Sequence, residues 1–554
     1  MIHSARATNA TPNESECNQI DPSKRSWLSI ATRPRNCFTF ALLVLLTWHV
    51  SWIVIDPHFP GLPKPVGDGP DYENIGFHLA NSGEYRFDNS APDWRQLYKD
   101  ANRFGLPSIS ERSAAEDSSI VSDAYQAQLT APRRNFLSTG RPPLLPMLIA
   151  TTYQIVGRNA IGFGTLRLLL ASSLAIAGAL STWLVVVILP HILGDQDAGL
   201  SQRTTERNTS RPAHNSALWS VLVAALVTIA LNLANTTLRG YATDFLTEPL
   251  ALLLLQLFVA TLVTAWLARS VTARIRLEII AGATLGLMIL SRSIFVAWLP
   301  FLLALVFLTA PPSRHNAETG SIEDPRRRWQ PKVWTCLLVF GTAILVCSPW
   351  WIRNCVVLDR IAPLGTQGAI TLVGGYSDAA LNANGEWQPG PEIRLRAELL
   401  DRHEFIALQD DTARESMVSK EANQRVRLWI REHWKDLPRL ALVRATTHWN
   451  PYSGKSLVWK ALIILGTIAI FLPSRAISRI DTKGDESRRQ SFAWLLVGLP
   501  LISTLSTALL YAAGGRFLVP CYGVLFSLSG IGIGWLMYQS LQGIWSSASD
   551  ENLQ

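Results

Sequence analysis

Long uninterrupted blocks of apolar residues constrain the fold of this chain more than any other sequence feature. Each block has roughly 17 to 25 residues, the length that a helix rising about 1.5 Å per residue needs to cross about 30 Å of hydrocarbon. The sequence therefore predicts an all-α integral membrane protein, built as a bundle of about ten transmembrane helices. The first block covers residues 37–55, and the others centre on residues 168–189, 218–233, 245–267, 277–290, 294–309, 333–349, 457–472, 492–510 and 517–538.

Basic residues lie mainly in the short polar loops between these blocks. The 554-residue chain has a formal charge of +8, with 48% hydrophobic and 17% charged residues. A basic excess spread over loops is typical of membrane topology, because Lys and Arg favour the cytoplasmic side, and it argues against a nucleic-acid partner. We therefore expect a multi-pass protein of the plasma (inner) membrane, with residues 1–36 and 539–554 as cytoplasmic tails.

Two long polar segments interrupt the apolar pattern, and the alternation of loops places both on the non-cytoplasmic side. The first, residues 56–140, lies inside a transmembrane core that covers residues 37–350. The second covers residues 351–456 and precedes C-terminal transmembrane helices at residues 457–538. A water-facing site is therefore expected in these two segments.

Helical periodicity inside both segments predicts ordered structure. An amphipathic helix resting on the membrane is expected at residues 71–83, and further helices are expected at residues 412–433 and 438–449. Residues 142–156 are apolar but too few to span, so we expect them to lie in the outer interface or to re-enter.

Ionisable residues at the expected outer ends of the helices are the candidate site residues, because charges at a membrane are costly unless they are solvated or paired. The acids are Asp68, Asp71, Asp244 and Glu248, and the bases are Arg141, Arg239, Arg292, Arg353 and Arg516. One interpretation makes Asp71 a helix N-cap and the arginines interfacial anchors. Another is that the arginines, gathered on one face, recognise a phosphate through bidentate contacts. His78 shares a helix face with Asp71, so a divalent metal stays open, although no second histidine lies at ligand spacing.

Several short motifs follow one another in an order that marks a known family. They are Asp71-Tyr72 with Leu79-Ala80 and Gly83, Arg141-Pro142-Pro143-Leu144-Leu145-Pro146, Arg167-Leu168, Glu248-Pro249, Leu290-Ser291-Arg292, Pro349-Trp350-Trp351-Ile352-Arg353-Asn354 and Gly515-Arg516-Phe517-Leu518-Val519-Pro520. In the order, spacing and placement of these motifs, residues 37–538 resemble the GT-C membrane glycosyltransferases. The chain is most similar to their bacterial branch related to protein O-mannosyltransferases and aminoarabinose transferases.

The resemblance implies a GT-C-like bundle and an inverting transfer of a sugar from a polyprenyl-phosphate carrier to a lipid, glycan or protein acceptor. Asp71 best matches the family's acid in the first outer loop, with Asp68 as the second candidate. Mannosyltransferase relatives often have two adjacent acids there, whereas this chain has Asp71-Tyr72. The outer arginines would hold the departing lipid phosphate, with Asp244 and Glu248 as supporting acids. No certain cofactor is implied.

Two other functions stay open. A transporter or flippase for a lipid-linked or anionic solute also suits outer arginines on a helical bundle. Transporters, however, usually place ionisable groups near the midplane and contain internal repeats, and the sequence indicates neither. A non-catalytic scaffold would leave the acids and arginines without a role.

Overall fold

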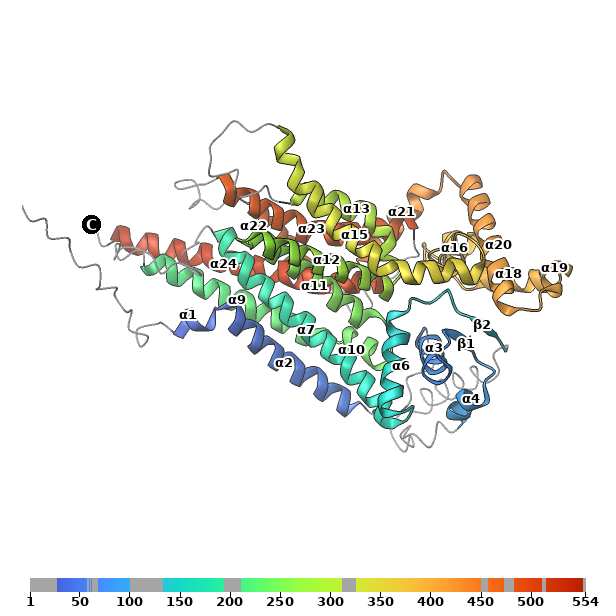
Figure 1. Ribbon diagram of the computed structural model, residues 1–554. Coiled ribbons are helices and arrows are strands. Elements are labelled where there is room, and N and C mark those ends of the chain that lie inside the picture. Colours follow the sequence, from blue (N-terminus) through green and yellow to red (C-terminus); the bar gives the residue numbers. More distant parts are fainter. Residues whose placement is uncertain are drawn as a thin grey trace, which may run out of the picture.

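Helices make up most of the structure, a computed structural model that describes residues 27–56, 59, 61, 68–99, 133–193, 211–310, 325–449, 457–472, 483–510 and 515–551. Long helices run side by side and form the body of the molecule (Figure 1). They are α2 (Pro34–Ile55), α7 (Ala160–Leu193), α9 (Arg211–Ala234), α11 (Glu248–Leu267), α12 (Val271–Ser291), α13 (Phe295–Thr309), α15 (Pro325–Leu358), α22 (Leu457–Phe471), α23 (Lys483–Leu510) and α24 (Tyr522–Glu551), the last preceded by the 3-10 helix η4 (Gly515–Cys521). Every apolar block predicted to span lies largely within one of these helices.

Seven helices of the described chain are long and apolar enough to cross a membrane. They are α2, α7, α9, α11, α15, α23 and the helical stretch made by η4 and α24. α13 and α22 are apolar but have only 15 residues each, and α12 carries Arg274, Arg276 and Glu278 in its first half. The prediction of an all-α, multi-pass membrane protein is confirmed, while the number of about ten spans stays a prediction.

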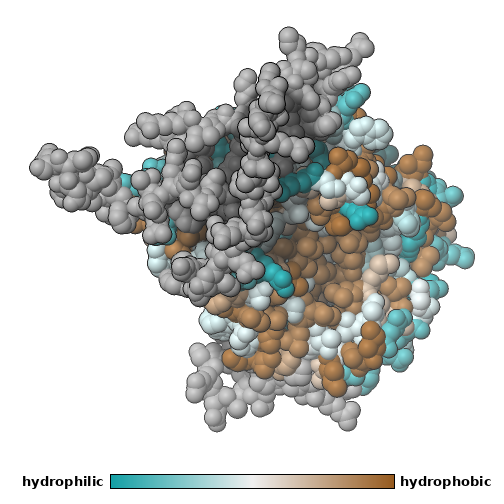
Figure 2. Space-filling view, turned by 60° about the vertical axis from the view of Figure 1, so that its left-hand side comes forward, coloured by the Kyte–Doolittle hydropathy of each residue, from teal (hydrophilic) through white to brown (hydrophobic). Residues whose placement is uncertain are grey.

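Exposed apolar side chains on the outside of the bundle fit contact with lipid. Phe40 and Leu43 on α2 and Leu345 on α15 are each more than half exposed. Figure 2 shows apolar residues gathered over much of one face of the molecule. Such a surface on a soluble protein promotes association, whereas in a membrane it meets hydrocarbon.

Small residues let neighbouring helices of the bundle approach closely. On α12, a Cβ added at Gly282 would lie 2.4 Å from the backbone oxygen of Val339 on α15. On α24, a Cβ added at Gly530 would lie 2.7 Å from the backbone oxygen of Ala224 on α9. Because the backbones are this close, only glycine fits at either position, as in many membrane helix pairs.

Both long polar segments fold at the same end of the bundle, away from α1 (Trp27–Ala31) and from the C-terminal end of α24 (Figure 1). The first contains α3 (Gly69–Ser82), β1 (Arg86–Asp88), α4 (Pro92–Lys99) and β2 (Asn135–Leu137), and it leads into α6 (Leu144–Val156). The second contains α16 (Gln367–Gly375), α17 (Asp378–Asn382), α18 (Gly390–Leu400), α19 (His403–Ala407), α20 (Asp411–Glu432) and α21 (Leu437–His448). The two segments therefore share one end of the bundle, and that this end faces the non-cytoplasmic side of a membrane stays a prediction.

α3 is the amphipathic helix predicted at residues 71–83. It ends at Gly83, whose φ of 73° is the left-handed conformation that favours glycine. α3 packs against α6, since a Cβ added at Gly76 would lie 2.5 Å from the side chain of Ile149. α6 has 13 residues, fewer than a span needs, as the sequence predicts. Most side chains of α3 are buried by these neighbours, which fixes the helix at the polar end of the bundle.

The second polar segment has a hydrophobic core of its own. Leu395 of α18 and Ala422 of α20 are buried in it, together with residues of α16 and α21. The two helices predicted in this segment are confirmed as α20 and α21. α15 continues past residue 351 to Leu358 and ends before Asp359, which has a φ of 48°, while the boundary at residue 351 stays a prediction.

Candidate functional site

A cavity of about 580 Å³ lies where the polar end meets the helical bundle. Its wall combines side chains of α3 and the β1–β2 ribbon with side chains from the α12–α13 turn, η4, α16, α18 and α20. Sites for small organic ligands usually measure about 300 to 1,000 Å³, so this cavity can hold such a ligand. The candidate residues that line it are Asp68, Asp71, Arg141, Arg292 and Arg516.

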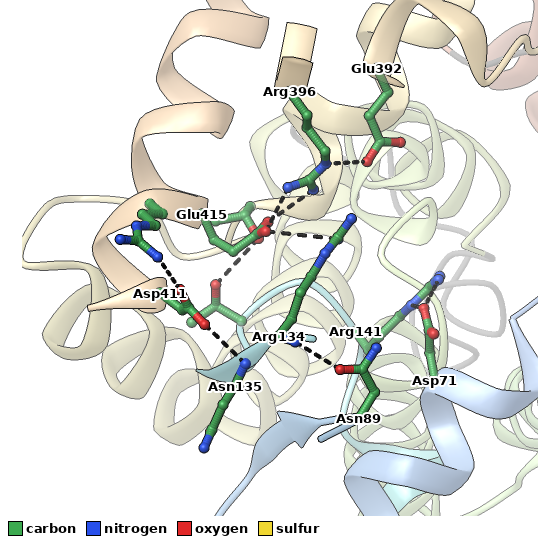
Figure 3. A network of polar contacts seen from close by, with 12 residues as sticks. Asp71, Asn89, Arg134, Asn135, Arg141, Glu392, Arg396, Asp411 and Glu415 are labelled. Carbon is green, nitrogen blue, oxygen red and sulfur yellow. Dashed lines mark hydrogen bonds and ion pairs between the residues drawn. The ribbon is translucent and has the colours of Figure 1, made fainter. Parts of the chain in front are cut away.

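Two carboxylates of the first polar segment share one arginine at this cavity. Arg141, which stands between β2 and α6, donates from Nη1 to Asp68 Oδ1 over 2.9 Å. Its Nε and Nη2 donate to Asp71 Oδ2 over 3.1 and 2.5 Å, a contact drawn in Figure 3. The guanidinium also lies 5.5 Å from the centre of the Tyr72 ring. Arg141 therefore fixes both acids at the cavity wall.

Glu248 at the start of α11 extends this contact into a continuous chain of ion pairs. Its Oε1 accepts from Arg292 Nη1 over 2.6 Å and also from Arg516 Nε. Arg516 Nη2 in turn contacts Asp68 Oδ2 at 2.9 Å. The Glu248 side chain is fully buried, and its Oε2 has no hydrogen-bond partner in the described structure. With Arg141 and Asp71 the chain joins three acids and three arginines, so its formal charges cancel.

Ion pairs decide the charged states of Asp68 and Arg141, and burial decides that of the neighbouring Tyr72. Burial would raise the pKa of Asp68, but the guanidinium groups of Arg141 and Arg516 outweigh burial and hold that pKa well below its usual range. Burial would lower the pKa of Arg141, but its contacts with Asp68 and Asp71 outweigh burial and raise it. Burial raises the pKa of the Tyr72 phenol to about 12. At neutral pH Asp68 is therefore ionised, Arg141 is charged, and Tyr72 keeps its proton.

Asp71 differs from Asp68 in having one carboxylate oxygen available. Asp68 uses one oxygen for Arg141 and the other for Arg516, whereas both bonds to Asp71 end on Oδ2. The Asp71 side chain is also the more exposed, at 37% against 28%. Asp71 Oδ1 can thus accept a proton or hydrogen bond from a ligand in the cavity.

The interpretation of Asp71 as a helix N-cap is wrong. α3 begins at Gly69, so Asp68 occupies the N-cap position and Asp71 lies in the first turn. Neither side chain makes a capping hydrogen bond, since both carboxylates are engaged by arginines. The helix starts early because Pro70, with its fixed φ and no N–H, suits the first turn of a helix.

Two of the predicted phosphate-binding arginines do not line the cavity. Arg353 donates to the backbone oxygens of Ser138 and Tyr85 over 2.8 and 3.1 Å. Arg239 lies over the rings of Trp48 and Trp52, with its guanidinium carbon 5.5 and 4.2 Å from the ring centres. The structure thus brings Arg141, Arg292 and Arg516 together and places Arg239 and Arg353 elsewhere.

Arg353 nevertheless supports the site through Tyr85. Its guanidinium lies 5.1 Å from the centre of the Tyr85 ring. The Tyr85 hydroxyl donates to the backbone oxygens of Arg141 and Pro142 over 3.0 and 3.1 Å. Because these bonds fix the backbone that carries Arg141, Arg353 has a positioning role in this geometry.

Asp244 and His78 are also candidate site residues from the sequence, but they do not line the cavity. The backbone oxygen of Asp244 lies against Gly69 at the start of α3, where an added Cβ would come within 2.4 Å. His78 Nε2 lies 3.0 Å from the backbone oxygen of Asp88. In the part of the chain that the structure describes, no group of three or more His, Cys, Asp or Glu residues is arranged to hold a metal ion.

Glu73, which was not predicted from the sequence, is a fully buried acid beside the site. Its carboxylate accepts from Arg158 Nε and Nη2 over 2.7 and 3.0 Å. It also accepts from Trp94 Nε1 over 2.7 Å and from the Tyr153 hydroxyl over 2.9 Å. With every oxygen engaged, Glu73 holds α3 against α4 and α6 and does not reach the cavity.

A second group of charged residues, which was not predicted from the sequence, lies on the cavity wall (Figure 3). Arg396 donates to both oxygens of Glu415 over 2.6 and 3.0 Å, and from Nε to Glu392 over 2.9 Å. Arg134 lies 4.0 Å from Glu415. Arg396 and Glu392 are four residues apart on α18, a spacing common on solvated helix faces, so the sequence does not distinguish them from ordinary surface residues.

Comparisons with known proteins identified no relative of this chain. The chain matches no protein-family model, and neither the curated proteins nor the solved structures contain a significant match to it.

Proposed function

We propose that this protein is a membrane glycosyltransferase. It transfers a sugar from a polyprenyl-phosphate donor to a hydroxyl acceptor, with inversion, at the polar end of the bundle. The observation that carries this proposal is Asp71, a carboxylate with one oxygen available, in a cavity that also holds Arg141, Arg292 and Arg516. A base and a phosphate-binding group are what a transfer from a sugar phosphate requires.

The proposed reaction is a single displacement. The acceptor oxygen attacks the anomeric carbon while the bond from that carbon to the phosphate oxygen breaks, and the electron pair of that bond leaves with the phosphate. The acceptor proton passes to Asp71 Oδ1. Arg292 and Arg516 offset the negative charge that grows on the phosphate, since charge-assisted bonds from guanidinium forks to phosphate are strong. Attack opposite to the leaving group inverts the configuration of the anomeric carbon.

The position of the arginines supports a donor that arrives from the membrane. Arg292 ends α12, and Arg516 lies in η4 directly before α24, so both come from the bundle rather than from the two polar segments. Their positive charge lies next to apolar helices of spanning length. A phosphate with a lipid chain can meet this charge while its chain stays in hydrocarbon.

Two further hollows continue from the cavity and offer a path for the lipid chain of the donor. A narrow hollow of about 20 Å³ shares Gly140, Arg141, Pro142 and Ser293 with the cavity, and its other lining residues are mostly apolar. It shares Trp351 and Pro363 with a hollow of about 650 Å³ along the end of α15. Ile352 and Val356 on this larger hollow are exposed, as expected for a surface that meets lipid. We propose that the prenyl chain follows this path.

The test is transfer by the purified protein. It is incubated with a panel of radiolabelled polyprenyl-phosphate sugars and a membrane extract, and labelled products are identified by mass. We expect one donor to label an acceptor in the wild type and not in Asp71→Asn. Uptake or flipping of the labelled lipid by reconstituted vesicles, without any labelled product, would instead identify the protein as a transporter.

A further inference from the structure

Part of the cavity wall has no role in the reaction proposed above. This part comes from the second polar segment and contains Gln367, Thr371, Glu386 and Trp387. The proposed base and the arginines that bind the donor phosphate come from α3, the end of α12, η4 and the residues before α6. A transfer reaction needs a second substrate in the same cavity, so the remaining wall is where that substrate can bind.

Trp387 presents a fixed aromatic surface to this part of the cavity. A Cβ added at Gly374 would lie 2.2 Å from Trp387 Nε1, so the indole lies directly against the α16 backbone. Its N–H donates to the backbone oxygen of Thr371 over 3.1 Å. The side chain is still 37% exposed. An aromatic ring whose polar atom is already bonded offers an apolar face, which suits the C–H face of a sugar ring.

The groups around Trp387 match a ligand rich in hydroxyl groups. Glu386 provides acceptor oxygens, and Gln367 and Thr371 can both donate and accept. Gln367 Nε2 donates to Thr371 Oγ1 over 3.2 Å, which orients the amide. A few polar donors and acceptors beside an aromatic face are typical of pockets that recognise polar organic ligands.

This wall directly adjoins the proposed base. A Cβ added at Gly140 would lie 3.3 Å from both Gln367 Oε1 and Thr366 Oγ1, so the start of α16 packs on the residue before Arg141. Arg141 in turn holds Asp71. A ligand on Trp387 and Gln367 is therefore next to the arginine that positions the proton acceptor.

The charged group behind this wall makes it rigid. Arg396 of α18 forms a bidentate pair with Glu415 of α20 and a further bond with Glu392. Bidentate arginine–carboxylate pairs fix geometry more strictly than single contacts. Since Arg396 and Arg134 together balance the charges of Glu392 and Glu415, this group shapes the wall more than it attracts an ionic acceptor.

An extended peptide fits this site poorly, because backbone groups on both edges of the β1–β2 ribbon are already bonded. On the β2 edge, the N–H groups of Asn135 and Leu137 donate to side chains at the start of α20 over 3.0 and 3.2 Å. On the β1 edge, Asn74 bonds both the N–H and the backbone oxygen of Asp88 over 2.8 and 2.9 Å. Strand addition needs a continuous row of unpaired groups on an edge, and these bonds interrupt the row on both edges.

We propose that this wall is the acceptor site and that the acceptor is a carbohydrate. One sugar ring stacks on Trp387 and bonds through its hydroxyl groups to Gln367, Thr371 and Glu386. This inference rests on the proposed transferase function and names its acceptor class.

The test measures binding of acceptor alone, so it does not depend on transfer. Saturation-transfer difference NMR is recorded on the purified protein in detergent with methyl glycosides of glucose, galactose, mannose and N-acetylglucosamine, and with a Ser/Thr-containing peptide. The variants are Trp387→Ala and Trp387→Phe, and the matched control is Trp434→Ala. Trp434 is 63% exposed in the same polar segment and does not line the cavity. Thermal unfolding of each variant shows whether it is folded.

We expect at least one glycoside to bind the wild type and Trp434→Ala equally. Trp387→Ala should weaken that binding about tenfold or more, as loss of a stacking aromatic commonly does, and Trp387→Phe should lose less. Binding of the peptide but of no glycoside would overturn the inference, and so would equal glycoside binding by Trp387→Ala. Glycoside binding that depends on Trp387, combined with no transfer from any donor, would support the carbohydrate-binding site but refute the transferase function.

Discussion

Arg516 donates to the buried carboxylate of Glu248, although 268 residues separate the two in sequence. The same carboxylate oxygen accepts from Arg292. In Glu248→Gln the guanidinium of Arg292 would lose its ion-pair partner, and that of Arg516 would keep only Asp68. Removing one partner of a buried ion pair costs about 3 to 5 kcal/mol, so we expect a clearly lower unfolding temperature.

Polyprenyl phosphate should reverse part of this loss, because its charge replaces the missing carboxylate. Thermal unfolding in detergent, with and without polyprenyl phosphate, measures both effects. Glu84→Gln is the control, since the Glu84 side chain is half exposed. A Glu248→Gln protein as stable as the wild type would argue against the structural role of this pair.

The two aspartates of the first polar segment should differ in kinetics. Asp71→Asn removes the proton acceptor but keeps the size of the side chain, so turnover should fall by about 100-fold to 10,000-fold with donor affinity retained. Asp68→Asn should mainly weaken donor binding, because Asp68 positions both Arg141 and Arg516.

Single-turnover rates and donor affinities of the two variants separate these effects. Asp93→Asn is a matched control, as Asp93 also lies in the first turn of a helix of this segment. If Asp71→Asn turns over normally and Asp68→Asn does not, the base is Asp68.

Donor affinity should depend on the arginines that line the cavity and not on those outside it. Hydrogen bonds to charged groups contribute about 1.5 to 3 kcal/mol, so Arg292→Gln should weaken donor binding by about ten-fold to 100-fold. Arg292→Lys keeps the charge without the fork and should give an intermediate loss. Arg239→Gln is the control, and equal losses in Arg239→Gln and Arg292→Gln would contradict phosphate binding at the cavity.

Blocking the narrow hollow should affect donors according to chain length. Val296 of α13 lines this hollow, so Val296→Trp would fill it. We expect use of long polyprenyl donors to fall about tenfold or more, with donors of one or two prenyl units used normally. Leu303→Trp, on an exposed position of the same helix, is the control. Equal loss for long and short donors would place the chain elsewhere.

His448 should make stability depend on pH in mildly acid solution. It is fully buried at the end of α21, where its Nε2 lies 3.1 Å from Ser503 Oγ, and burial lowers its pKa from 6.5 to about 4. The unfolded chain then binds a proton that the folded chain rejects, so stability is complete above about pH 6.5 and is lost as pH falls toward 4. Unfolding temperatures between pH 7 and 4 should fall less steeply in His448→Gln than in the wild type or in the exposed control His403→Gln. Parallel curves would contradict this assignment.

The helices could be predicted from sequence because each apolar block fixes its own local structure. The end of α15 could not, since it depends on the φ of Asp359 rather than on hydrophobicity. Asp68, Asp71, Arg141 and Arg516 are candidates from sequence because charges near a membrane are costly, but their order in one ion-pair chain depends on the packing of distant segments.

The same limit applies to the arginines outside the cavity. Arg239 and Arg353 stand at the ends of predicted spans in the same way as Arg292, and sequence alone gives no reason to separate them. What separates them is the neighbour that each meets: two tryptophans for Arg239, backbone oxygens for Arg353, and Glu248 for Arg292. Trp387 was not predicted either, because its indole is held in place by close contact with Gly374 of α16, which the sequence does not reveal.

The cancelled charges of the ion-pair chain have a consequence for selectivity among anions. A free anion in the surrounding water meets no net positive charge here, and it must break an existing ion pair to bind Arg292 or Arg516. A phosphate attached to a prenyl chain is already concentrated at the membrane surface beside these arginines, because its chain stays in hydrocarbon. Inorganic phosphate has no such anchor, so at equal bulk concentration it should compete poorly with a lipid-borne phosphate for the same arginines.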